Sequence, residues 1–268
     1  MIARMTTKTL ALTAIALPLA LGLASCGSND DAETALNGEP VAAVAAPEGQ
    51  EWSEIAEMTD RNGYLVGNPD APIKMIEYGS LTCPGCAAFS QQAIEPLMKD
   101  YVDTGKVSFE FRSFAIHGPI DLALTRLIDC GSPSQAVPLA EQIWANLPTL
   151  LQPVQQRSQQ LDAALALPED QRFVAFAETA GLLDFFAARG ISRDQARTCL
   201  ADAKRLSEIA EYSESYGTQD DIRGTPTFVI NGTQLDGGSW ESVEAALQRA
   251  GARGWRYGAF ASLVSRAS

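Results

Sequence analysis

The stretch EYGSLTCPGCAAF (residues 77–89) contains two cysteines separated by two residues, and it lies where one structural pattern gives way to another. On the amino-terminal side of the two cysteines, Ile73–Tyr78 is a short run of residue types that favour β-strands. On the carboxyl-terminal side, Cys86–Met98 has the pattern of a helix. Cys83 and Cys86 are therefore expected at the amino terminus of a helix that directly follows a strand.

This position suits thiol chemistry. The thiolate is the reactive form of cysteine, and a helix amino terminus offers it free N–H groups and a partial positive charge. Pro84 fits the first helical turn, because its missing N–H would have no partner there. Cys86 is close enough in sequence to resolve a mixed disulfide formed at Cys83. Half of a zinc site is the alternative, but the chain has no second pair at this spacing and a single histidine, so no metal is expected.

The pattern beyond the motif predicts a strand, a helix and a second strand, then a helical block, and finally a hairpin with a last helix. Lys106–Phe114 alternates apolar and polar residues, which predicts a half-buried strand. Ile120–Tyr216 is helical in pattern, with breaks at prolines and at a glycine. Thr227–Ile230 and Gln234–Asp236 flank Asn231-Gly232 and predict a hairpin. A right-handed crossover would make the first two strands parallel.

Composition excludes several classes of protein. The chain has 268 residues, of which 46% are apolar, as in an ordinary soluble protein of one or two domains. It carries 33 acidic against 20 basic side chains, a net charge of −13, which argues against a nucleic-acid partner. One histidine nearly excludes a Ser-His-Asp hydrolase or a site with several histidine ligands. The cysteines remain as the chemical groups of interest.

Three separated motifs give the sequence a family resemblance. EYGSLTCPGCAAF, KVSFEFRSF and RGTPTFVING occur in this order, with the helical block between the second and the third. Together they resemble the DsbA family of thioredoxin-fold thiol–disulfide oxidoreductases. The resemblance implies an α/β, thioredoxin-like domain at residues 62–251. It also implies a large all-helical insertion, about residues 118–217, between the second and third core strands.

The resemblance assigns a role to each residue that matches a family motif. Cys83 matches the exposed nucleophile and Cys86 matches its buried partner. Pro226 matches the cis-proline that faces the active-site disulfide, and the backbone of Thr225 before it would pair with an extended substrate chain. Glu77 matches the acid that the family places beneath the cysteine pair.

Two of these assignments have a plainer alternative. Pro226 could open a strand with a trans peptide bond. Glu77 alternates with Ile73 and Met75, which would place its carboxyl group on their covered face. Burial would raise the pKa of this carboxyl group and let it exchange a proton with Cys86. At the end of a strand, the same side chain could instead reach solvent.

Pro84 and Gly85, between the two cysteines, are expected to face the substrate. Many family members carry histidine in place of Gly85, and this histidine helps to keep the nucleophile ionised and the disulfide strongly oxidising. Glycine supplies only its backbone N–H. The pKa of Cys83 is therefore expected in the upper half of the range of about 3.5 to 7 that such motifs cover. This departure leaves the direction of electron flow open.

Two further cysteines lie at the two ends of the helical block. In an exported protein, the simplest interpretation of Cys130 and Cys199 is a structural disulfide that closes about 70 residues and contributes roughly 4 kcal/mol at most. A second redox pair is the alternative, although it has no CxxC spacing behind it. His117 is interpreted as an ordinary loop residue rather than one that tunes the active site.

The amino terminus has the pattern of an export signal. Basic residues precede an uncharged stretch of about 15 residues, which is short for a membrane span of about 20. This stretch ends in Leu23-Ala24-Ser25-Cys26, which resembles the bacterial lipobox, in which Cys26 becomes the lipidated first residue of the mature protein. Residues 1–25 are therefore expected to be a lipoprotein signal peptide. A plain cleaved signal and a retained membrane helix are the alternatives.

The segments outside the domain have biased composition. Residues 26–61 are expected to form a flexible, acidic, Ala- and Pro-containing tether, and residues 252–268 a C-terminal tail. The predicted location is periplasmic, with a lipid anchor in a bacterial membrane. Gly27 after Cys26 resembles lipoproteins that are sorted to the outer membrane.

The resemblance implies thiol–disulfide exchange with cysteine-containing exported polypeptides, favoured in the direction of a DsbA-like oxidase. A membrane redox partner would re-oxidise or reduce the cysteine pair, and no metal or organic cofactor would be needed. A disulfide isomerase or reductase of the same fold is one alternative. A non-catalytic peptide-binding or chaperone lipoprotein and a copper-delivery protein are the others, although the copper proteins use a wider cysteine spacing and a downstream histidine.

Overall fold

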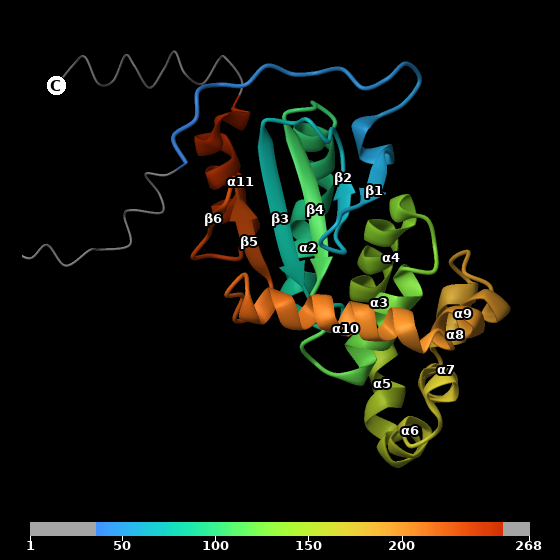
Figure 1. Ribbon diagram of the computed structural model, residues 1–268. Coiled ribbons are helices and arrows are strands. Elements are labelled where there is room, and N and C mark those ends of the chain that lie inside the picture. The colour runs from blue at the N-terminus through green and yellow to red at the C-terminus, as the bar shows by residue number, and fades with distance from the viewer. Residues whose placement is uncertain (1–35, 254–268) are drawn as a thin grey trace, which may run out of the picture.

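The computed structural model describes residues 36–253, which form a mixed β-sheet with helices on both faces (Figure 1). The strands are β1 (Ala56–Met58), β2 (Tyr64–Val66), β3 (Ile73–Gly79), β4 (Val107–Ser113), β5 (Thr227–Ile230) and β6 (Thr233–Gln234). Their order in the sheet is β1-β2-β4-β3-β5-β6. β3 and β4 are parallel, as predicted, and the other neighbouring pairs are antiparallel.

The helical insertion between β4 and β5 is confirmed. It consists of α3 (Pro119–Ile128), α4 (Pro133–Ala145), α5 (Leu147–Gln156), α6 (Ser158–Leu165), α7 (Glu169–Ala180), α8 (Leu182–Ala187), α9 (Arg193–Leu200) and α10 (Ala203–Thr218). The α-helices outside it are α2 (Pro84–Pro96), which continues as the π-helical turn Leu97–Val102, and α11 (Trp240–Leu247), which continues as Gln248–Ala252. A short 3-10 helix, Trp52–Glu54, precedes β1. The fold is thioredoxin-like, with the large insertion placed beside one end of the sheet (Figure 1).

One face of the sheet is apolar and lies against α2 and α11. The face of β3 that carries Ile73 and Met75 is almost completely buried. On the same side, the ring centroid of Phe89 in α2 lies 4.3 Å from that of Phe228 in β5. Phe89 also packs edge-on against Trp240 of α11, at a centroid distance of 6.4 Å. These contacts fix the position of α2, and with it the cysteine pair at its amino terminus.

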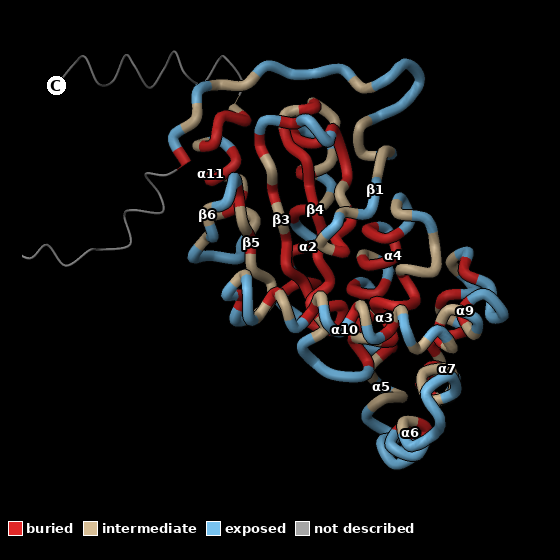
Figure 2. Tube along the Cα trace, in the orientation of Figure 1, coloured by how far each residue is buried: buried red, intermediate tan, exposed pale blue. Residues whose placement is uncertain are grey.

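On the opposite face of the sheet, α10 crosses near the carboxyl ends of β3 and β4, as Figure 1 shows. Tyr216 of α10 packs edge-on against Tyr78 of β3, at a centroid distance of 5.2 Å. The prediction of a half-buried strand was wrong for β4, because all seven of its residues are buried (Figure 2). Hydrogen bonds compensate for the burial of its charged residues. Arg112 pairs with Glu110 at 2.8 Å (Nε to Oε1) and donates to the hydroxyl of Tyr78 in β3 at 2.7 Å.

The expectation of a flexible tether is wrong for residues 36–61. Their backbone is fixed to the domain by hydrogen bonds from Gly38 N to Arg249 O and from Val41 N to Gly251 O, both at 2.9 Å. The indole of Trp52 donates to the carbonyl of Val44 at 2.8 Å, and β1 extends the sheet. Main-chain hydrogen bonds hold this segment, and they depend little on side-chain composition.

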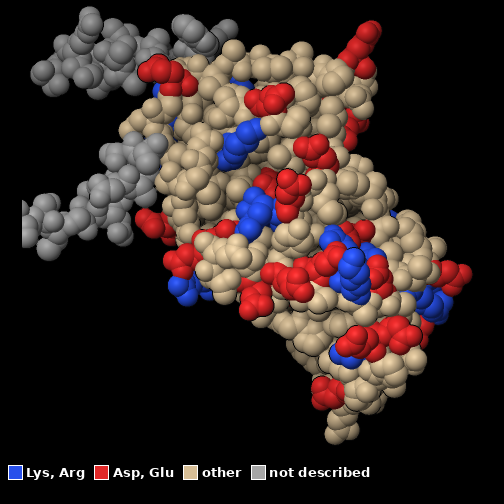
Figure 3. All heavy atoms as spheres, viewed as in Figure 1, with Lys and Arg blue, Asp and Glu red and all other residues tan. Residues whose placement is uncertain are grey.

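The predicted signal peptide, Cys26 and most of the C-terminal tail lie outside the described residues. The described chain begins and ends near α11, away from the carboxyl ends of β3 and β4 (Figure 1). Within residues 36–253, no helix combines the length and the apolar character that a membrane crossing requires. On the face viewed in Figure 3, basic and acidic side chains are interspersed rather than gathered into a basic patch.

Candidate active site

The cysteine pair lies where the sequence pattern predicted it. β3 ends at Gly79, and Cys83 is the N-cap residue of α2, with extended backbone angles (φ −80°, ψ 121°). Pro84 occupies the first helical turn, and the amide of Ala87 donates to the carbonyl of Cys83 at 3.1 Å. Cys83 therefore sits directly before the free N–H groups of the helix terminus.

The two thiols differ in accessibility. Both are free in the structure, and Cys83 keeps 7% of its surface exposed, whereas Cys86 is fully buried. The family resemblance implied a freely exposed nucleophile, but the structure gives Cys83 only a narrow opening. Of the two sulfurs, only that of Cys83 is within reach of an incoming molecule.

The two thiols also differ in acidity. Hydrogen bonds lower the pKa of Cys83 from 9.0 to about 5, the largest contribution coming from the Cys86 thiol, and burial opposes them. Thr225 and the backbone N–H groups of Gly85 and Cys86 add to the effect. The same Cys86–Cys83 hydrogen bond, together with burial, raises the pKa of Cys86. The pKa of Cys83 lies at the acidic edge of the range expected for a motif with Gly85, and Cys86 and Thr225 contribute to it.

Glu77 lies in the interior, on the covered face of the sheet, as its alternation with Ile73 and Met75 predicted. It is 2% exposed, and its Oε1 atom has no hydrogen-bond partner among the described residues. Burial, and to a smaller extent the charge of the Cys83 thiolate, raise the pKa of its carboxyl group from 4.5 to about 8. Glu77 is therefore a neutral acid at neutral pH, and it is close enough to Cys86 to raise the pKa of that thiol.

The loop before β5 lies against the nucleophile. The Thr225–Pro226 peptide bond is cis, as expected, and the Cys83 thiol donates to the Thr225 carbonyl at 3.3 Å. The Thr225 hydroxyl is buried and has no hydrogen-bond partner among residues 36–253. A Cβ atom at Gly85 would lie 3.1 Å from Pro226 Cδ and 3.6 Å from Cys83 Sγ. Gly85 thus lets the two loops approach each other closely.

A small hollow adjoins the cysteine pair on the side of the helical insertion. It has a volume of about 300 Å³, and Pro84, Thr82, His117 and Ile120 line it together with side chains of α5. The loop that precedes Cys83 is held from the same side by Asp121 of α3 and Trp144 of α4. No local sequence pattern points to these two residues, because their partners lie about 40 and 64 residues away in the chain.

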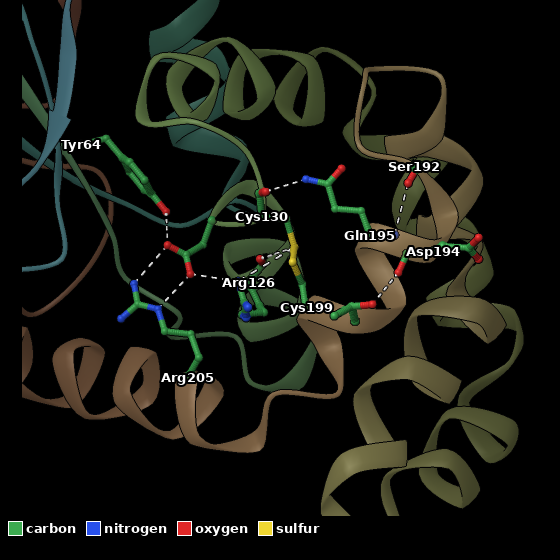
Figure 4. Close-up of a disulfide and its surroundings, with 10 residues drawn as sticks. Tyr64, Arg126, Cys130, Ser192, Asp194, Gln195, Cys199 and Arg205 are labelled. Carbon is green, nitrogen blue, oxygen red and sulfur yellow. Dashed lines mark hydrogen bonds and ion pairs between the residues drawn. A yellow bond between two sulfur atoms is a disulfide. The ribbon is translucent and has the colours of Figure 1, made fainter.

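The second cysteine pair is bonded. A disulfide joins Cys130, just after α3, to Cys199 in α9, at a Cα–Cα distance of 6.0 Å (Figure 4). Asp129 beside it accepts from Arg126 at 3.0 Å and from Arg205 at 2.9 Å. Among the described residues, no cluster of three or more His, Cys, Asp or Glu side chains is arranged to hold a metal ion.

Comparison with known proteins agrees with this geometry. A family model described as thioredoxin matches residues 59–249. A Rickettsia bellii protein named "Putative protein-disulfide oxidoreductase" is 26% identical over 191 residues, which are 71% of this chain and 65% of that protein. The chain therefore spans about two thirds of the length of this curated relative. Disulfide bond formation protein D of Bacillus subtilis is 35% identical over 54 residues, which are 20% of this chain and 24% of that protein.

Solved structures extend the similarity to the whole domain. The crystal structure of a protein-disulfide isomerase from Novosphingobium aromaticivorans is 26% identical, with a TM-score of 0.64, over 72% of this chain and 97% of that one. Wolbachia pipientis alpha-DsbA1 is 21% identical and shares the fold, with a TM-score of 0.57 over 70% of this chain and 90% of that one. The chain therefore belongs to the thioredoxin family, with the DsbA-type architecture that its motifs indicated.

Proposed function

We propose that this protein is a thiol–disulfide oxidoreductase that exchanges disulfides with cysteine-containing polypeptides through Cys83 and Cys86. One observation carries the proposal: two adjacent free thiols have opposite properties. Cys83 is reachable and has its pKa lowered to about 5, whereas Cys86 is fully buried and has its pKa raised. Such a pair supplies one sulfur as the entry point and a second sulfur to complete the exchange.

The favoured direction is oxidation of the substrate. A substrate thiolate attacks Cys83 Sγ of the Cys83–Cys86 disulfide, and Cys86 leaves as a thiolate. Glu77, a neutral acid at neutral pH, supplies the proton that Cys86 requires. A second substrate thiolate then attacks the substrate sulfur of the mixed disulfide and releases Cys83 as a thiolate. The substrate gains one disulfide, and the enzyme gains the two electrons.

The acidity of Cys83 supports this direction. A thiolate that is stabilised in the reduced enzyme makes the disulfide a better oxidant, because reduction then yields the more stable form. The Thr225 hydroxyl, buried and without a partner in the described part of the chain, adds a donor that the Cys83 thiolate can satisfy. The backbone at Thr225 and Pro226 would hold an extended substrate, with Pro84 and Gly85 on the other side of the sulfur.

Isomerisation or reduction of disulfides is the second candidate. It is favoured by the similarity to the Novosphingobium protein, which is named a protein-disulfide isomerase. The reduction potential of the Cys83–Cys86 couple separates the candidates, because about −120 mV is typical of an oxidant and about −270 mV of a reductant. In cells, alkylation trapping would find an oxidase mainly in the bridged form.

The proposal places this reaction outside the cytoplasm. Residues 1–25 would act as a lipoprotein signal peptide, and Cys26 would carry the lipid that anchors the protein to a bacterial membrane. Described residues 36–61 pack on the domain. Since the described chain begins away from the carboxyl ends of β3 and β4, this anchor would leave the cysteine pair facing exported polypeptides (Figure 1). A membrane redox partner would restore the disulfide.

The test is oxidative refolding of a reduced, unfolded protein in the presence of the purified full chain. The wild-type protein should accelerate formation of disulfides, and Cys83→Ser should not. Cys86→Ser should accumulate mixed disulfides with its substrates, because the second sulfur is missing. A wild-type protein whose Cys83 titrates like free cysteine and gives no acceleration would contradict the proposal.

A further inference from the structure

The loop Ser80–Thr82, which connects β3 to Cys83, is held by the first helix of the insertion. We infer that Asp121 and His117 are positioning residues for the nucleophile: by fixing this loop, they fix where Cys83 presents its sulfur. The inference rests on the proposed function and assigns a part in the reaction to the helical insertion. The observations that carry it are the burial of Asp121, the number of its hydrogen bonds and the place where they end.

Asp121 is 1% exposed, and each oxygen of its carboxylate accepts two hydrogen bonds. Oδ1 accepts from the amide of Thr82 at 3.0 Å and from its hydroxyl at 2.7 Å. Oδ2 accepts from the Ser80 hydroxyl at 2.8 Å and from the amide of His117 at 3.1 Å. A buried carboxylate is costly unless it is fully hydrogen-bonded, so these four donors are held firmly in place.

These hydrogen bonds also determine how His117 binds. The hydroxyl protons of Ser80 and Thr82 are both donated to Asp121. His117 Nδ1 lies 3.0 Å from the Ser80 oxygen, 2.9 Å from the Thr82 oxygen and 3.4 Å from Asp121 Oδ2. With both hydroxyl protons directed at Asp121, the tautomer of His117 that carries a proton on Nδ1 completes the network as a donor. His117 therefore closes the network from the solvent side, where it is half-exposed. The sequence predicts an ordinary loop residue at His117. In the structure its backbone amide donates to Asp121, and its ring contacts the hydroxyl oxygens of Ser80 and Thr82.

The backbone of the same loop is held by α4. The indole N–H of Trp144 donates to the carbonyl of Ser80 at 3.0 Å, and the amide of Cys83 donates to this same carbonyl at 3.2 Å. The backbone atom that orients the amide of Cys83 is thus itself held by the insertion. Movement of the loop would displace Cys83 from the Thr225 carbonyl and from the Cys86 thiol.

Stabilisation of α3 alone does not explain this arrangement. Asp121 lies in the first turn of α3, where an acidic residue favours the helix terminus. Three of its four hydrogen bonds, however, go to Ser80 and Thr82 rather than to the amino terminus of α3. The buried carboxylate therefore serves the loop before the nucleophile more than it serves its own helix.

Asp121→Asn tests the inference directly. The amide has the shape of the carboxylate, but one of its two polar groups is NH2. Because each oxygen of Asp121 faces one backbone N–H, either orientation of the amide places NH2 against a backbone donor. We expect the pKa of Cys83 to rise by about one unit and its alkylation below that pKa to slow about tenfold. The ultraviolet absorbance of the thiolate and the alkylation rate measure these two effects.

Thr125→Val is the matched control. Thr125 lies one turn further along α3 and is fully buried, and its hydroxyl bonds to the Ser113 hydroxyl and to the backbone carbonyl of Asp121 rather than to Ser80 or Thr82. This variant should lose stability without a change in the titration of Cys83. A role of Asp121 in stability alone would make the two variants behave alike, and that result would overturn the inference.

His117 provides an independent pair of variants. His117→Ala removes the donor to the two hydroxyl oxygens and should slow alkylation of Cys83 several-fold. His117→Asn keeps an N–H close to the position of Nδ1 and should restore most of the lost rate. Equal rates in the two variants would show that this hydrogen bond does not position the nucleophile.

If Asp121→Asn does not fold, Thr82→Val carries the test. This variant keeps the backbone bond to Asp121 and loses the hydroxyl contacts to Asp121 and His117. A smaller rise in the pKa of Cys83 is expected, and an unchanged titration would overturn the inference. Failure of the proposed function is a separate result, because it would show in the wild-type protein as a Cys83 that titrates like free cysteine.

Discussion

The two cysteine pairs of this chain differ in spacing, neighbours and bonding. Cys83 and Cys86 are two residues apart at a helix amino terminus, with free thiols whose pKa values are shifted in opposite directions. Cys130 and Cys199 are 69 positions apart, and their disulfide joins two parts of the helical insertion beside a cluster of charged side chains (Figure 4). The surroundings of each sulfur, rather than cysteine itself, separate a reactive pair from a bonded one.

The largest expected effect is loss of exchange on removal of the entry sulfur. Cys83→Ser should reduce disulfide formation in a substrate to the uncatalysed rate, because no other described sulfur is both ionised and reachable. The double change of Cys130 and Cys199 to Ala should leave the alkylation rate of Cys83 close to that of the wild type. Loss of Cys83 reactivity in the double variant would mean that the two pairs are not independent.

The second effect is on stability. Removal of the Cys130–Cys199 disulfide should lower the free energy of unfolding by about 2–4 kcal/mol, the typical contribution of a disulfide. Urea unfolding of the wild type and the double Ala variant measures the difference. A mild reductant should lower the free energy of unfolding of the wild type by the same amount, provided that it can reduce this disulfide in the folded protein. An unchanged unfolding midpoint in the double variant would contradict a structural role.

Replacement of Glu77 should affect the reactivity of the Cys83–Cys86 pair and the pH dependence of stability, whereas loss of the Cys130–Cys199 disulfide affects only stability. Glu77→Gln keeps the shape of the side chain and removes its titration, so exchange should slow about tenfold or more through loss of proton transfer with Cys86. Because burial raises the pKa of Glu77 from 4.5 to about 8, wild-type stability should fall as the pH rises through this interval. The variant should lack this part of the slope. Parallel stability–pH curves for the two proteins would contradict the assignment.

The parts of the molecule that the sequence predicted are those encoded by short patterns. Cys83 at a helix start, Glu77 on the covered face and Pro226 beside the pair each follow from their immediate neighbours or from a family motif. Glu110 and Arg112 have the pattern of solvent-exposed residues, but they are buried, pair with each other and interact with Tyr216 of α10. Burial of a polar face depends on a distant helix, and alternation within one strand does not reveal it.

The same limit applies to the short strands and to the site. The alternating pattern does not indicate β1 and β2, because each is only three residues long. Asp121 is one acid among 33, and nothing nearby in the sequence links it to Ser80. Its importance depends on a contact between the insertion and the loop before Cys83. Long-range hydrogen bonds of this kind are specified by the packed fold, whereas the chemistry of the cysteine pair is specified locally.

The smallest expected effect concerns Gly85, where the family resemblance leads one to expect histidine in a strongly oxidising member. Gly85→His places a cation beside the Cys83 thiolate, which should lower the pKa of Cys83 below about 5 and make the couple more oxidising by roughly 30 mV for each 1.4 kcal/mol gained. Gly85→Ala is the matched control, because it adds the same Cβ atom, 3.1 Å from Pro226 Cδ, without the charge.

Redox equilibrium with glutathione measures both potentials, and the comparison between them isolates the charge from the crowding. If the histidine and alanine variants shift the potential equally, crowding against Pro226 is the cause. A shift confined to the histidine variant shows that Cys83 still has unused capacity for stabilisation. The pair would then owe its present acidity to Cys86, Thr225 and the backbone N–H groups, and Gly85 would set the limit of its oxidising power.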